Sequence, residues 1–321
     1  MWYLVVLEIG DKMVDLKLQF PEGFFDGETR CGYYISPEMK KVWAVELDLL
    51  AKVMEVCQKY DIKYFANSGT LLGAARHNGM IPWDDDIDLM MKRDDYDKFC
   101  QVAKIEFQFP YFFQTEETDP GSLRGHVQIR NSLTTGILKG ELEADKTFNQ
   151  GIFLDIFPYD YFPDDDLEEA RFRKHLSRLK NRYLRMYALT DGYVSAKTLW
   201  KKPIKWIIHE ILSLGKVSYI TAYNKFLSEI QKYNKKTTKK LASGVFPDEN
   251  YYLTQEEWNE TTWLPFEMLK IPVPAKYKDV LGRQYGNWKK YQKGTSVHGG
   301  VIFDTEHSYQ EYLKNVKCNS Q

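Results

Sequence analysis

The chain of 321 residues lacks the features that mark several classes of protein. It contains no run of about 18 apolar residues, so we expect no membrane-spanning helix. Its four cysteines show no paired metal-ligand spacing, and Cys57 and Cys100 lie in apolar helical patterns that predict buried free thiols. Segment 1–9 is apolar but lacks the basic residues that precede the apolar part of a signal peptide. These absences predict a protein of a reducing compartment, the cytoplasm.

The chain also lacks internal repeats, low-complexity linkers and a marked net charge, which is −1. A hydrophobic content of 43% is ordinary for a soluble globular protein. We expect an α/β (α+β) fold with an accessory β-hairpin or meander over 1–35 and a catalytic core over 36–160. Residues 161–321 are expected to form a basic helical elaboration and a C-terminal part that completes the core.

Turn, cap and periodicity signals place the elements along the chain. Gly10-Asp11, followed by the alternating segment 13–20, predicts a β-hairpin. Ser36-Pro37-Glu38 predicts the start of a helix that runs to about Tyr60. Further strands are expected at 63–66, 84–91, 107–113, 126–130 and 151–157, and further helices at 71–76, 95–105 and within 164–240.

Clustered carboxylates in the segment Ser68–Met91 are the most informative feature that is present. In an extended strand Asp84, Asp86 and Asp88 share one face, with no Lys or Arg among them. Like charges repel unless a hard cation lies between their oxygens, so Asp86 and Asp88 are candidate ligands of Mg²⁺ or Mn²⁺. The alternative is a solvated acidic turn. Asp84 either serves the metal site or caps the turn before it, and Asp85 is expected on the other face.

Four further residues are candidates for binding a phosphorylated donor. Gly69 and Thr70 lie at a helix start, where glycine allows close backbone approach and the N–H groups favour phosphate. Arg76 either neutralises the donor phosphate or forms a structural salt bridge. Arg130 ends an apolar strand and is expected to point into the same cleft.

The segment GTLLGAARHNGMIPWDDDIDL (69–89) resembles the signature of the LicD family, which includes bacterial phosphocholine transferases and fukutin-related proteins. Similarity continues at IRNSLTTG (129–136), GIFLDIFPYD (151–160) and FEMLKIPVPAKYKDVLGRQYG (266–286). The chain departs from many members at Asn67-Ser68, where they carry another glycine. The resemblance implies a mixed sheet like that of polymerase-β-type nucleotidyltransferases, with flanking helices. It also implies transfer of a phospho-alcohol from a CDP-activated donor to a glycan hydroxyl, with release of CMP.

Asp155 is a single acid inside an apolar strand, and burying an isolated charge is costly. In the polymerase-β-like plan that the resemblance implies, a third carboxylate joins the first two from a neighbouring strand. Asp155 would there bind the metal and accept the proton of the attacking hydroxyl. The alternative is a buried Asp paired with an Arg or with backbone amides.

The resemblance makes CDP-choline the expected donor and a cell-surface glycan, such as a lipopolysaccharide or teichoic acid, the expected acceptor. Two alternatives stay open: a nucleotidyltransferase that uses an NTP and releases pyrophosphate, and a non-catalytic glycan- or membrane-binding relative.

The run 200–208, WKKPIKWII, combines Trp, Lys and bulky apolar residues, as segments at a membrane surface do. It predicts either a peripheral membrane contact that engages a lipid-linked acceptor or an ordinary helix with a solvated basic side. No nucleic-acid-binding motif accompanies the charge, so nucleic acid is not an expected partner.

Overall fold

The protein is described by a computed structural model over residues 13–142, 146–190, 218–236, 238–245, 249–292 and 300–319. Its strands are β1 (Glu28–Arg30), β2 (Tyr33–Ile35), β3 (Phe65–Ala66), β4 (Asp88–Lys92), β5 (Tyr111–Gln114), β6 (Val127–Asn131), β7 (Thr135–Leu138), β8 (Ile152–Phe162), β9 (Lys240–Ala242), β10 (Tyr252–Thr254), β11 (Thr261–Phe266), β12 (Leu269–Pro274) and β13 (Val301–Asp304). Its helices are α1 (Pro37–Lys59), α2 (Ser68–His77), α3 (Arg93–Glu106), α4 (Lys139–Leu142), α5 (Asp166–Thr190), α7 (Tyr219–Ile230), α8 (Gln255–Asn259), α9 (Tyr277–Tyr285) and α10 (Tyr309–Asn319), with a 3₁₀ turn η2 (Gln231–Tyr233).

A mixed sheet forms the centre of the molecule, which confirms the expected α/β class. Its strands follow the order β10-β9-β8-β4-β3, and β6 pairs with β8 and carries β5 on its other side. The pair β4–β8 is parallel, whereas β3–β4, β6–β8 and β8–β9 are antiparallel. Three smaller two-stranded sheets, β1–β2, β11–β12 and β7–β13, lie around this centre.

The helix α1 forms where its cap signals predict. The Ser36 hydroxyl accepts a hydrogen bond from Met39 N, and Pro37 occupies the first turn, where its missing N–H is no loss. The hairpin expected at 13–20 is wrong, because this segment contains no strand. Lys17 N and Leu18 N instead donate to Asp48 Oδ1 on α1, at 2.8 and 2.7 Å. Residues 1–12 lie outside the described part of the chain.

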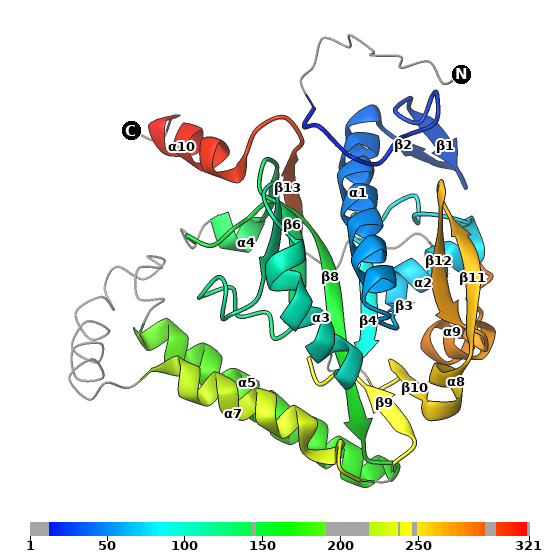
Figure 1. Ribbon diagram of the computed structural model, residues 1–321, viewed down its shortest axis with the longest axis vertical. Helices are drawn as coiled ribbons and strands as arrows, with labels where there is room; N and C mark the ends of the chain where they lie inside the picture. Colours follow the sequence, from blue (N-terminus) through cyan, green and yellow to red (C-terminus); the bar gives the residue numbers. More distant parts are fainter. Residues whose placement is uncertain are drawn as a thin grey trace.

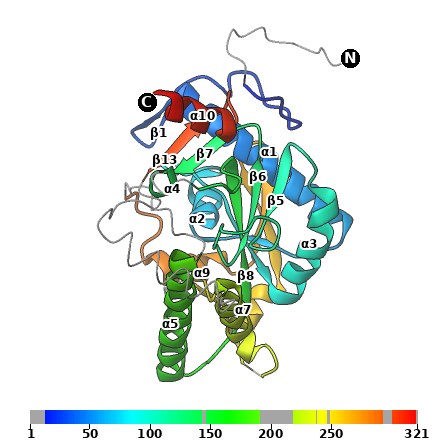
Figure 2. The same ribbon diagram turned by 90° about the vertical axis from the view of Figure 1, so that its left-hand side faces the viewer.

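Different helices pack against different strands of the central sheet. Helices α1 and α3 pack against β8, while α2 contacts β4 and extends toward α9 and β11 (Figure 2). Strand residues alternate accordingly: Leu154 and Ile156 belong to the main core with α1 and α3, whereas Asp155 points to the opposite face. The position of the acids on the sheet follows from this alternation.

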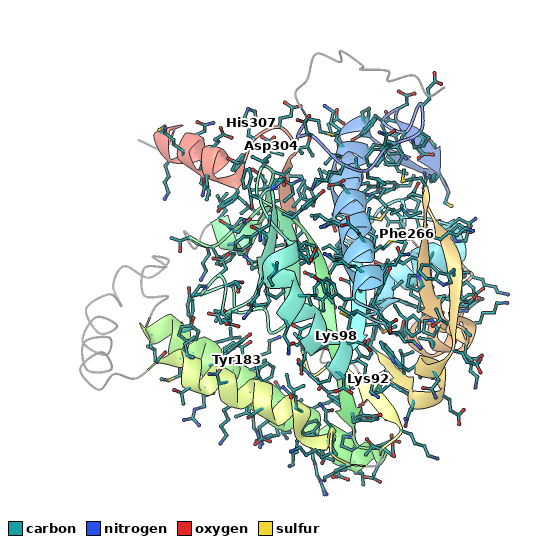
Figure 3. The ribbon with its side chains drawn as sticks, viewed as in Figure 1. Lys92, Lys98, Tyr183, Phe266, Asp304 and His307 are labelled. Atoms are coloured by element: carbon teal, nitrogen blue, oxygen red, sulfur yellow. The ribbon has the colours of Figure 1, made fainter. Side chains whose placement is uncertain are left out.

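A second, smaller core lies between α5 and α7, which run side by side at one end of the molecule (Figure 1). Tyr183 of α5 is fully buried there against Tyr223 and Phe226 of α7 (Figure 3). Phe162, the last residue of β8, is also part of this core. The domain boundary expected between 160 and 161 therefore falls inside β8.

The C-terminal segment returns to the sheet region. Strand β13 pairs with β7, and Asp304 at its end accepts hydrogen bonds from Glu306 N and His307 N. His307 Nδ1 lies 3.0 Å from Asp304 Oδ2 (Figure 3). Among the described residues, none of the helices is both long and apolar enough to span a membrane. The run 200–208 lies outside them.

Candidate functional site

The clustered carboxylates occupy a loop that leads into β4. Asp84 N donates to Ile81 O at 2.9 Å and closes a turn, and the chain joins the sheet only at Asp88. Trp43 of α1 donates from Nε1 to Asp84 O at 3.1 Å, which fastens the loop to α1. Asp84 is thus hydrogen-bonded through its N–H to Ile81 and through its carbonyl oxygen to α1.

The first three acids of the loop converge. Carboxylate oxygens of Asp84, Asp85 and Asp86 all lie within 4.8 Å of one another. The expectation that Asp85 points away is wrong, because residues 84–87 are not strand and the alternation of faces does not apply to them. Within the described residues, Asp88 is outside this closest group.

The parallel pairing of β4 with β8 brings Asp88 and Asp155 together. These two residues are Cα partners in the register, and Asp155 N donates to Ile87 O at 2.9 Å. Paired residues of neighbouring strands project to the same face, so both carboxylates lie on the same side of the sheet. Residues 67 positions apart in sequence (155 − 88) thus meet at the start of β4.

Glu46 is a further acid of the site that sequence reasoning missed. It lies on α1 and is 1% exposed. Burial raises the pKa of Glu46 well above its usual value, and the nearby charges of Asp85, Asp84 and Asp155 raise it further. A signal was present in the sequence, because Glu46 stands four residues after Val42 and three before Leu49 on the apolar stripe of the helix.

The acids have different electrostatic surroundings. Burial raises the pKa of Asp86 well above its usual range, and Asp84, Glu46, Asp85 and Asp155 add to this effect. Repulsion of this kind favours a cation among the oxygens.

The pKa of Asp155 is shifted in the opposite direction. Burial alone would raise this pKa, but the nearby His126, a hydrogen bond from Gln128 and the charge of Arg124 bring it below its usual value. His126 Nε2 lies 3.4 Å from Asp155 Oδ1. His126 also lines a cavity of about 600 Å³ between α3 and α7. Asp155 is therefore an ionised carboxylate held in place by basic and amide groups.

The start of α2 lies directly against the acidic loop. Ser68 adopts a positive φ of 44°, and a Cβ added at Gly69 would lie 2.8 Å from Asp84 Oδ2. A side chain at position 69 would therefore collide with the carboxylate. Thr70 Oγ1 accepts a hydrogen bond from Asp88 N at 2.8 Å. Thr70 thus anchors the first residue of β4 through its hydroxyl oxygen, and its O–H can still donate.

The two arginines proposed as phosphate-binding residues are both hydrogen-bonded to the protein. Arg76, at the C-terminal end of α2, donates from Nη1 to Trp288 O and Lys290 O, at 3.1 and 3.3 Å. Its contacts fasten the segment after α9. Arg130 is fully buried, so the cleft position expected for it is corrected. Its guanidinium donates to Gln114 Oε1, Gly151 O and Gln128 Oε1, each at 2.6 Å, and is fully engaged by the protein.

The donor set fits a hard divalent cation. Every candidate ligand is a carboxylate oxygen, the type that Mg²⁺ and Mn²⁺ prefer. Asp84, Asp85 and Asp86 converge closely enough to share one ion, and Asp88, Asp155 and Glu46 lie around them.

The family model described as "LicD/FKTN/FKRP, nucleotidyltransferase domain" matches residues 61–179, which include the acidic loop, β4 and β8. The lipopolysaccharide cholinephosphotransferase LicD of Haemophilus influenzae is 29% identical over 251 residues, which are 76% of this chain and 88% of that protein. The chain thus contains a domain that matches the LicD family. The chain is also similar to an uncharacterized protein of Rickettsia prowazekii, 49% identical over 120 residues, which are 37% of this chain and 42% of the relative. Human ribitol 5-phosphate transferase FKRP is 44% identical over 54 residues, 17% of this chain and 11% of the relative.

Proposed function

We propose that this protein transfers phosphocholine from CDP-choline to a hydroxyl of a glycan and releases CMP. The observation that carries the proposal is the convergence of Asp84, Asp85 and Asp86 beside Asp155, in a chain similar to a lipopolysaccharide cholinephosphotransferase over most of its length. The human relative's name, a ribitol 5-phosphate transferase, supports phospho-alcohol transfer as the wider class.

We propose Mg²⁺ or Mn²⁺ as the cofactor, with Asp84, Asp86, Asp88 and Asp155 as ligands and Asp85 as an additional one. When bound, the ion would neutralise the diphosphate of the donor and stabilise the charge that develops on the leaving CMP. The carboxylates would hold the ion in a fixed position, because the loop is bonded to α1 through Trp43 and lies close against α2 at Gly69.

The reaction needs little covalent chemistry from the protein. An oxygen of the acceptor hydroxyl forms a bond to the phosphorus that carries choline, and the bond from that phosphorus to the CMP oxygen breaks. The electron pair leaves with CMP, and the hydroxyl proton passes to Asp155. The depressed pKa of Asp155 keeps it ionised at neutral pH, the form that binds a cation and accepts a proton. Positioning and charge neutralisation supply most of the rate enhancement in phosphoryl transfer of this kind.

The acceptor is proposed to be a lipid-linked glycan reached from the cytoplasmic side of the membrane. The basic run 200–208, which carries Lys201, Lys202 and Lys205, would attract an anionic surface. This run lies outside the described residues, so the sequence alone supports this part of the proposal.

Product analysis tests the reaction. Purified protein is incubated with Mg²⁺ and CDP-choline, CDP-ribitol, CDP-glycerol or an NTP, with and without lipopolysaccharide or teichoic acid. CMP release that depends on CDP-choline and the glycan would support the proposal. Pyrophosphate release from an NTP would instead support a nucleotidyltransferase. Absence of turnover together with absence of any nucleotide-induced thermal shift would favour a non-catalytic relative.

A further inference from the structure

Glu46 differs in its surroundings from most other buried acids of the described residues, and only Asp155 among them likewise has a buried carboxylate oxygen, Oδ1, without a hydrogen-bond partner. Asp48, two positions further along α1, accepts hydrogen bonds from Lys17 N, Leu18 N and the Tyr111 hydroxyl, all between 2.7 and 2.8 Å. Other buried acids also accept hydrogen bonds. Glu116 accepts them from backbone amides, Asp160 from Arg93, Glu169 from Arg173, and Glu257 from Arg283. Each of these acids is bonded to N–H or O–H donors.

Glu46 has no comparable compensation. Its Oε2 atom is buried and has no hydrogen-bond partner among the described residues. The three charged groups that act on it, Asp85, Asp84 and Asp155, are all acidic. An ionised carboxylate in such a place is destabilised by lost solvation and by repulsion at once.

Glu46 lies on the part of α1 that contacts the acidic loop. Three residues before it on the same helix, Trp43 donates to Asp84 O, so one face of α1 is in contact with this loop. Asp155, which also acts on Glu46, belongs to β8, against which α1 packs. Glu46 thus lies where α1, the loop and β8 meet.

We infer that Glu46 supplies a carboxylate oxygen to the divalent cation held by the Asp84–Asp86 loop, and so makes α1 part of the metal site. The observation is a buried carboxylate oxygen without a hydrogen-bond partner, surrounded by acids that already converge. A hard divalent cation such as Mg²⁺ or Mn²⁺ is the chemical group that compensates such a set of oxygens. The inference rests on the metal dependence proposed above. Glu46 lies outside residues 61–179, which the family model matches.

The test measures metal binding directly, in the absence of any donor. Mn²⁺ is titrated into the full chain and free Mn²⁺ is followed by electron paramagnetic resonance. We expect Glu46→Gln to weaken Mn²⁺ binding at least tenfold and to reduce the rise in melting temperature that Mn²⁺ produces. In EDTA, Glu46→Gln should melt at the same temperature as wild type or higher, because a buried like charge is removed.

Asp48→Asn is the matched control, because Asp48 is an equally buried acid of the same helix with hydrogen bonds to the protein. It should lower the melting temperature with or without Mn²⁺ and leave the Mn²⁺ affinity within about twofold of wild type. Glu46→Met, which has similar volume and no charge, replaces the Gln variant if that variant does not fold.

The outcomes separate this inference from the proposed function. If wild type binds Mn²⁺ and the Glu46 variants bind it equally well, Glu46 is not a ligand, while metal-dependent transfer stands. If wild type binds no Mn²⁺ yet forms phosphocholine product in EDTA, the metal dependence itself is refuted. A large drop in melting temperature for Glu46→Gln in EDTA would also overturn the inference, because it would show that the carboxylate stabilises the metal-free protein.

Discussion

Arg130 Nη2 donates a 2.6 Å hydrogen bond to Gln128 Oε1, and Gln128 in turn hydrogen-bonds the carboxylate of Asp155. A fully buried arginine therefore acts on the site through an amide rather than by contact with substrate. Burial lowers the pKa of Arg130 to about 10, which still leaves it charged at neutral pH. Arg130 is a positioning residue: it fixes the amide orientation that lets Gln128 donate to Asp155.

Replacing Arg130 with Lys should destabilise the protein and disturb Asp155. A lysine cannot donate to Gln114, Gly151 O and Gln128 together, so buried acceptors lose their partners. We expect the free energy of unfolding in urea to fall by about 2 kcal/mol or more. Arg178→Lys, on the exposed side of α5, is the control and should change stability little. Equal stability of the two variants would contradict the role of the three hydrogen bonds that the Arg130 guanidinium donates.

Asp86→Asn or Asp88→Asn should abolish turnover without loss of the fold. Both acids lie in the acidic segment, and Asp86 is subject to repulsion from four neighbouring carboxylates. Removing one charge relieves that repulsion, so the melting temperature in EDTA should hold or rise slightly. CMP release and thermal melting are measured side by side, with Asp94→Asn on the exposed start of α3 as the control. Near wild-type turnover in either site variant would refute the ligand assignment.

Asp155→Asn should reduce the rate of CMP release by about 100-fold or more, the effect expected on removal of a positioned base. His126→Gln should have a smaller effect, because it removes the neighbour of Asp155 and leaves the carboxylate itself. Single-turnover rates at saturating CDP-choline separate this loss from weaker donor binding. A His126→Gln variant as impaired as Asp155→Asn would contradict the primary role of the carboxylate, because it would show that turnover depends equally on the imidazole.

His77 and His307 should make opposite contributions to the pH dependence of stability. Burial, with Arg76 and Arg30 nearby, lowers the pKa of His77 to about 4. The unfolded chain, with a histidine pKa near 6.5, therefore binds the proton more tightly, and stability contributed by neutral His77 is lost as the pH falls from about 6.5 to about 4. Asp304 raises the pKa of His307, so its contribution is present at low pH and is lost as the pH rises through that pKa.

Urea unfolding between pH 4 and 8 checks both signs. His77→Gln should flatten the acid side of the stability profile, because the ring no longer has to lose a proton to accept the 2.9 Å hydrogen bond from Arg76 Nε. His307→Gln should reduce stability on the acid side instead. The same change of slope in both variants would contradict these assignments.

Much of the fold could be predicted because its signals are local. Ser36 and Pro37 mark the start of α1 within a few residues, and the structure confirms the cap. Leu89 and Met91 alternate with Asp88 and Met90 as a buried strand requires, and β4 forms there. Asp155 was predicted as a site residue because an acid inside an apolar strand needs a partner, and the structure places it opposite Asp88 through parallel strands far apart in sequence.

What the sequence did not predict depends on contacts between distant segments. Strand periodicity was applied to residues 84–87, but the turn closed by Asp84 and Ile81 delays the strand until Asp88, so Asp85 joins its neighbours. Glu46 was not singled out, because its surroundings come from a loop 38 residues later (84 − 46). Arg130 was expected in the cleft, and the strand β5 beside it supplies the Gln114 that binds it instead.

The strand β8 has a consequence for how the molecule can be divided. Its 11 residues begin in the main core with Leu154 and Ile156 and end in the second core with Phe162. The α5–α7 pair is therefore not an independent unit that can be removed or exchanged between homologues at residue 160. A junction at that residue would separate Phe162 from the rest of β8 and expose apolar residues of the second core to water. Chimeras should therefore leave β8 uncut and place their junctions outside residues 152–162.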